Sequence, residues 1–163
     1  MLTVRPSLPA DVPQIMRVIR AARAYMKATG NPTQWGDSRP SSLAIESDIQ
    51  RGCSYVITDE SGTVRGTFAL LLGDEPTYRI IRDGCWLNEL PYGTIHRVAS
   101  DGECHGIFAA CLAFCSALTP NLRIDTHEKN MTMRHLIEKS GFTRCGIITV
   151  NDGSERIAYQ RTK

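Results

Sequence analysis

The sequence contains no long apolar run, and none of its hydrophobic stretches approaches the ~20 residues that a membrane-spanning helix requires. It has six cysteines but no C-x-x-C pair, so a zinc site built on that spacing is not expected. It also lacks a run of basic residues, and its net charge of +2 is too small to favour nucleic acid as a partner. We therefore expect no metal, no membrane and no nucleic acid among its partners.

Length and composition are those of an ordinary globular protein. The 163 residues suit a single domain covering 1–163, and 42% apolar with 22% charged residues is typical of such a domain. Cys111 and Cys115 share a predicted helix face with Leu112, which favours buried packing over disulfide or metal chemistry. The first residues, MLTVRPS, lead directly into a strand pattern. We expect reduced thiols and a cytoplasmic protein.

Hydrophobic periodicity predicts an α/β fold with a mixed sheet and helices on both faces. Strands are expected at 2–6, 53–58, 63–72, 92–100, 122–126, 143–150 and 156–161. Helices are expected after Asp11, which is the expected N-cap, up to Gly30, and at 42–51, 105–118 and 130–140. Residues 78–81 fit either a strand or a short helix. The resulting order is β α α β β β α β α β β.

The most informative segment runs from residue 94 to residue 142. TIHRVAS reads as a strand, DGECHGIFAA as a turn that opens a helix, NLRIDTH as a second strand and KNMTMRHLIEKSGF as a second helix. A glycine-marked helix start directly after a strand presents free N–H groups and the positive end of the helix dipole to an anion. The segment therefore predicts a phosphate site, with the plain N-terminus of a buried helix as the alternative.

This segment resembles the acetyl-CoA-binding core of the GNAT superfamily of N-acetyltransferases. The family signature, Gln/Arg-x-x-Gly-x-Gly/Ala, falls without gaps on residues 105–110. Ala110 fits its last position, whereas His105 replaces the Gln or Arg and Phe108 replaces the first glycine. IEKSGF at 137–142 is similar to the family's Tyr-Glu-Lys-Leu-Gly-Phe. The element order matches the family over nearly the whole chain.

The resemblance implies that acetyl-CoA is the co-substrate. Its pyrophosphate would lie at the backbone of the signature, its pantetheine would pair with strand backbone as an added strand does, and an asparagine would contact the same arm. The cofactor-binding residues implied in this way are Val98, Ser100, His105, Gly106, Ile107, Phe108, Ala109, Ala110 and Asn130. We expect the Phe108 side chain to point into the core, which leaves the backbone N–H groups available to phosphate.

Acetyl transfer to an amine requires a base for the amine and, in many family members, a tyrosine acid for the leaving thiolate. The tyrosine position is Ile137, so no residue can be assigned that role. His96 is the first candidate base, because alternation along 94–100 places it with Thr94, Val98 and Ser100 on one strand face, at a spacing the family uses. His127, at the end of the next strand, is the second candidate. Each histidine has a purely structural role as its alternative.

The acceptor cannot be identified from the sequence. Gln34 and Trp35 lie in a Pro/Gly-rich loop and are candidates for the acceptor pocket, with packing under the loop as the alternative for Trp35. Glu89 is a candidate partner for a cationic amine. The leading hypothesis is an N-acetyltransferase acting on an amine of a small molecule or peptide. The alternative is a non-catalytic acyl-CoA-binding or protein-interaction module of the same fold, and a homodimer is left open.

Overall fold

The computed structural model describes all 163 residues, which form two compact units, Met1–Leu70 with His96–Phe114 and Leu71–Ile95 with Cys115–Lys163. Seven strands form one mixed sheet in the order β1-β2-β3-β4-β5-β7-β6. The strands are β1 (Thr3–Pro6), β2 (Ser54–Thr58), β3 (Val64–Leu72), β4 (Gly93–Ser100), β5 (Asn121–Thr126), β6 (Thr143–Thr149) and β7 (Glu155–Thr162). The helices are α1 (Val12–Ala28), α2 (Ser42–Gln50), α3 (Ile107–Leu118) and α4 (Met131–Lys139). The predicted order of elements is confirmed; the single domain stays a prediction.

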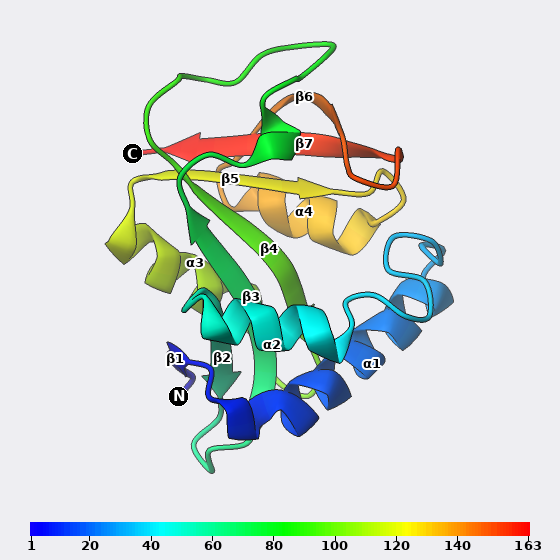
Figure 1. Ribbon diagram of the computed structural model, residues 1–163, viewed down its shortest axis with the longest axis vertical. Helices are drawn as coiled ribbons and strands as arrows, with labels where there is room; N and C mark the ends of the chain where they lie inside the picture. Colours follow the sequence, from blue (N-terminus) through cyan, green and yellow to red (C-terminus); the bar gives the residue numbers. More distant parts are fainter. The chain divides into compact units, whose positions relative to one another are not determined.

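The first unit is built on antiparallel strands β1, β2 and β3, with the second half of β4 beside β3. Helices α1 and α2 contact each other, as Figure 1 shows in blue and cyan. Apolar residues of α1 recur at helical spacing and pack on the strands, which forms the core of this unit. That core contains Ile15, Val18, Ile19, Ala22, Ile45, Val56, Val64 and Ala99.

The second unit contains the start of β4 and the strands β5, β7 and β6. β4 pairs in parallel with β5 over Gly93–Ile95, and β7 lies between β5 and β6, antiparallel to both. Figure 1 shows β7 in red beside β5 in yellow. A core of Tyr78, Trp86, Cys145, Ile148 and Ala158 supports these strands. The buried guanidinium group of Arg123 stacks 4.1 Å from the Trp86 ring centroid and 3.9 Å from that of Tyr92.

Three local predictions differ from the structure. The helix expected at 105–118 begins at Ile107, so His105 and Gly106 belong to the preceding loop. Residues 78–81 form neither the strand nor the short helix considered for them, because a 3-10 turn at Pro76–Tyr78 ends there and residues 79–81 are irregular. Asp11 precedes α1 as expected but does not cap it, because its carboxylate accepts from the Leu8 N–H group and pairs with Arg5 at 2.8 Å.

All six cysteines are free, and Cys53, Cys111, Cys115 and Cys145 are buried. The burial of Cys111 and Cys115 confirms their predicted packing role. No helix has both the length and the apolar character needed to cross a membrane. No group of three or more His, Cys, Asp or Glu side chains is placed to hold a metal ion.

Phe108 is 6% exposed, which confirms its predicted burial. Truncating a buried aromatic removes its burial energy and leaves a cavity, so Phe108→Ala should lower the free energy of unfolding by ~3 kcal/mol. Chemical denaturation measures this change. Leu118→Ala is the control on the same helix, because Leu118 is 53% exposed and should change stability little. Equal effects of the two substitutions would contradict the assigned role of Phe108.

Candidate active site

The start of α3 has the geometry of an anion site. The first intrahelical hydrogen bond runs from the Ala110 N–H group to the Gly106 carbonyl at 2.9 Å. The N–H groups of residues 107–109 therefore lie ahead of that bond and have no partner within the helix. Gly106 adopts φ +83°, in the left-handed region, and a Cβ there would meet nothing closer than Leu2 Cδ1 at 4.0 Å. Glycine is needed here for backbone conformation rather than for space.

The loop that leads into α3 is held by a buried carboxylate. The Asp101 side chain is 2% exposed, and its Oδ2 accepts from Arg17 at 3.1 Å and from Arg65 at 3.2 Å. Its Oδ1 accepts from the Glu103 N–H group at 3.0 Å. Charge-assisted hydrogen bonds of this kind fix geometry strongly. Asp101 therefore sets where the loop leaves β4 and where α3 begins, a role that its sequence context did not indicate.

A second contact brings the start of α3 close to the sheet. A Cβ built on Gly66 in β3 would lie 2.6 Å from Ile107 Cγ2 and 3.2 Å from the Ala99 carbonyl oxygen. Only glycine allows Ile107 to pack this closely, so Gly66 contributes to the position of the helix start. A glycine inside a strand is a recognised sign of such close approach, and the sequence contained that signal.

β4 is irregular at the predicted base. Arg97 has φ +54°, an uncommon conformation for a non-glycine residue, and the pairing of β4 with β5 ends at Ile95. The strict alternation assumed for residues 94–100 is therefore interrupted, and the predicted shared face of Thr94, His96, Val98 and Ser100 is not a regular one. Thr94 is fully buried, whereas the other three are half-buried.

The irregular backbone lies next to a buried carboxylate that sequence reasoning missed. Asp48 of α2 is 1% exposed, and its Oδ2 lies 3.1 Å from Arg97 Nη1. Burial raises the pKa of the Asp48 carboxyl, while the charges of Arg97, Arg51 and His96 act to lower it. Asp48 follows Ile45 by three positions, so helical spacing already placed it on the buried face of α2. Asp48 thus belongs to the electrostatic surroundings of His96.

The raised pKa of Asp48 has a consequence for stability. Because the folded state holds this proton above the ordinary value of 3.8, wild-type stability should fall as pH rises from 3.8 through the raised pKa. Asp48→Asn cannot lose a proton, so the difference in melting temperature, variant minus wild type, should grow over that window. Thermal denaturation between pH 3.5 and pH 7 measures it. Glu46→Gln, at an exposed position of α2, is the control. A difference that does not vary with pH would refute the assignment.

His127 lies just after β5, in the second unit. Its Nδ1 accepts a hydrogen bond from the Lys129 N–H group at 3.1 Å. In the neutral imidazole the proton is therefore on Nε2, which makes Nε2 a donor. Burial, followed by the nearby charge of Arg156, lowers the pKa of His127 and favours this neutral form. The basic nitrogen of neutral His127 is thus occupied by this hydrogen bond, which would have to break before His127 could accept a proton.

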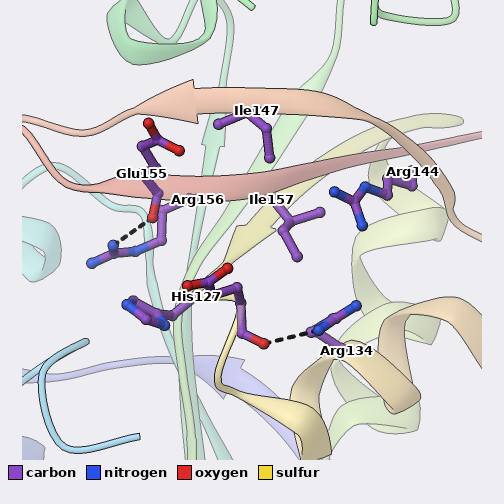
Figure 2. Close-up of a pocket in the computed structure, with 8 residues that line it drawn as sticks. His127, Arg134, Arg144, Ile147, Glu155, Arg156 and Ile157 are labelled. Carbon is purple, nitrogen blue, oxygen red and sulfur yellow. Dashed lines mark hydrogen bonds between the residues drawn. The ribbon is translucent and has the colours of Figure 1, made fainter. Parts of the chain in front are cut away.

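The second unit contains a cavity of about 440 Å³ beside His127, shown in Figure 2. Its polar lining comes from the β5–α4 loop, α4, β6 and β7, and its apolar lining is Ile147 and Ile157. The charged and polar residues are His127, Glu128, Arg134, Arg144, Glu155 and Arg156. Apart from His127, none of these residues was singled out from the sequence, because strands and a helix far apart in the chain bring them together.

The other predicted residues have mixed outcomes. Asn130 is the N-cap of α4, and its Oδ1 accepts from the Met133 N–H group at 3.1 Å. Trp35 packs against the core of the first unit, which supports the alternative of a packing role. Gln34 Oε1 accepts from Asn31 Nδ2 at 2.8 Å, and Glu89 is exposed. The roles proposed for these four residues toward ligands stay predictions.

Comparison with known proteins gives matches among solved structures only, since no family model and no curated protein matches the chain. A GNAT-family acetyltransferase from Streptococcus agalactiae is 34% identical, with a TM-score of 0.90 over 99% of this chain and 95% of that one. GNAT-family acetyltransferases from Listeria monocytogenes (22% identity, TM-score 0.73, 99% and 95% covered) and Bacillus cereus (16%, 0.64, 100% and 98%) share the fold.

The mixed seven-stranded sheet and its four helices thus define the fold of the GNAT acetyltransferases. At 34% identity over almost its full length to one such acetyltransferase, this chain belongs to the GNAT family, as its sequence predicted.

Proposed function

We propose that the protein is an N-acetyltransferase that transfers the acetyl group of acetyl-CoA to an amine of a small molecule or peptide. Membership of the family supports acetyl transfer in general. The observation that carries the proposal is the start of α3, where free N–H groups follow a left-handed glycine and a loop fixed by Asp101.

The residues at the start of α3 fit the pyrophosphate of acetyl-CoA. Ile107 and Phe108 turn buried side chains inward, so their N–H groups and that of Ala109 stay at the helix end, where a phosphate is favoured. The Phe108 side chain, which replaces the signature glycine, therefore does not cover the backbone N–H groups. His105 is exposed beside this site and can donate to a phosphate oxygen. Acetyl-CoA, when bound, supplies an activated thioester.

In this proposal His96 removes the proton from the acceptor amine, directly or through a water molecule. Its position on β4, two residues before Val98, places it next to the segment whose backbone would pair with pantetheine. Asp48 and Arg97 set the electrostatic environment of His96. Proton transfer by a positioned side chain accelerates such reactions by ~10²–10⁴-fold.

The leaving thiolate has no evident proton donor. Ile137, at the position of the family's tyrosine, is 0% exposed and apolar. The Tyr78 hydroxyl donates to Asp125 and that of Tyr159 donates to Glu138. A thiolate is a stable leaving group, so protonation by water is sufficient. The same observation favours the second candidate, a non-catalytic acyl-CoA-binding module. Such a module would bind acetyl-CoA without transferring its acetyl group to any amine.

Gly106→Val tests the cofactor site. A β-branched residue is strained at φ +83°, so the substitution should distort the start of α3 and weaken acetyl-CoA binding at least about tenfold, measured by calorimetry. Gly153→Val in the β6–β7 turn is the matched control, with φ +84° and similar free space. Similar acetyl-CoA affinities of the two variants would show that the pyrophosphate does not bind at this loop.

His96→Ala tests the base. Release of CoA with an amine substrate should slow by about 10²–10⁴-fold while acetyl-CoA affinity stays nearly unchanged, and the rate–pH profile should lose one limb. His127→Ala should keep that limb, which is the rise in rate at low pH as the base loses its proton. If His127→Ala loses the limb instead, the base is His127; if neither substitution matters, the acceptor arrives neutral and the protein contributes mainly positioning.

A further inference from the structure

The cavity of the second unit concentrates positive charge in a protein whose net charge is only +2. Arg134 comes from α4, Arg144 from β6 and Arg156 from β7. Of the two carboxylates in the lining, that of Glu155 forms an ion pair with Arg82, outside the lining. Three guanidinium groups therefore share the cavity with one remaining carboxylate, that of Glu128.

Two of these arginines have donors to spare. Arg144 is exposed and forms no hydrogen bond or ion pair within the protein. Arg134 Nη1 donates to the Glu128 carbonyl oxygen at 2.9 Å, but its Nε is buried without a hydrogen-bond partner. The donors that a ligand can reach without competing bonds are therefore those of exposed Arg144. Figure 2 shows the guanidinium groups of Arg134 and Arg144 on the same side of the cavity.

His127 adds a neutral donor to this set. Because Nδ1 accepts from Lys129, Nε2 carries the proton of the neutral ring. Nearly buried Arg156, 6% exposed, donates through Nη1 to Ser154 Oγ at 2.8 Å and to the Glu155 carbonyl oxygen at 2.9 Å, and these bonds orient its side chain. The cavity is therefore rich in donors that suit an oxyanion.

The size and remaining lining of the cavity indicate a small molecule. Its volume of about 440 Å³ lies within the range of roughly 300–1,000 Å³ that is usual for ligand sites. Ile147 and Ile157 supply an apolar wall for a side chain. Glu128 can accept from a positively charged amine, so the cavity offers partners to both ends of a zwitterion.

We propose that this cavity binds a small amine that carries a carboxylate, such as an α-amino acid, with the carboxylate at the arginines. Planar guanidinium groups pair with carboxylate and phosphate alike, but the Glu128 carboxylate in the lining repels the more highly charged phosphate more strongly, which favours a carboxylate. The identification of the ligand as the acceptor rests on the proposed N-acetyltransferase function. The carboxylate site itself does not depend on it.

The test compares α-amino acids with their α-carboxamides, which keep the amine and side chain but lose the negative charge. Wild-type protein should bind and acetylate the acids better. Arg144→Gln should weaken binding of the acids by about ten- to a hundredfold and leave that of the amides unchanged. Arg79→Gln is the control, since Arg79 pairs with Asp74 outside the cavity lining and its loss changes the net charge equally.

Binding and turnover are measured separately, by calorimetry with each amine and by CoA release. If wild type binds acids over amides and Arg144→Gln abolishes the difference, the carboxylate site stands, even where no amine releases CoA and the proposed function fails. If CoA is released but wild type does not distinguish acid from amide, the carboxylate site is overturned and the proposed function stands. Equal losses in Arg144→Gln and Arg79→Gln would also overturn it.

Discussion

The buried carboxylate of Asp101 is the contact on which the first unit's candidate site depends. It receives Arg17 from α1 and Arg65 from β3 while its other oxygen holds the loop after β4. One side chain thereby ties a helix, a strand and the loop that leads into α3 together. The N–H groups at the start of α3 are useful to a ligand only while this geometry holds.

β4 differs from a regular strand because its two halves have different backbone geometry. Its first residues are paired and buried, whereas from His96 onward the chain passes through the left-handed conformation of Arg97. A strained residue persists where its surroundings hold it, and here Asp48 supplies an ion pair from α2. The same carboxylate acts on His96, so backbone irregularity and the electrostatics of the candidate base have one structural origin.

The two histidines considered as bases differ in their surroundings. His127 accepts from a backbone N–H group and presents a donor to a cavity of arginines. That arrangement suits recognition of an anion better than removal of a proton. His96 has no arginine cavity around it but lies beside a buried carboxylate. The roles of both histidines toward ligands stay predictions.

The sequence alone determined the element order, the buried faces of α1 and α3, the burial of Phe108 and the family, because periodicity and turn residues act over a few positions. It also located the α3 start to within two residues. Only the tertiary structure decided the partners of Asp48 and Asp101 and brought the arginine cavity together. Arg65 lies 36 positions from Asp101 in the chain, and Arg97 lies 49 positions from Asp48. Such contacts depend on which elements the fold brings together, and no local pattern of residues encodes them.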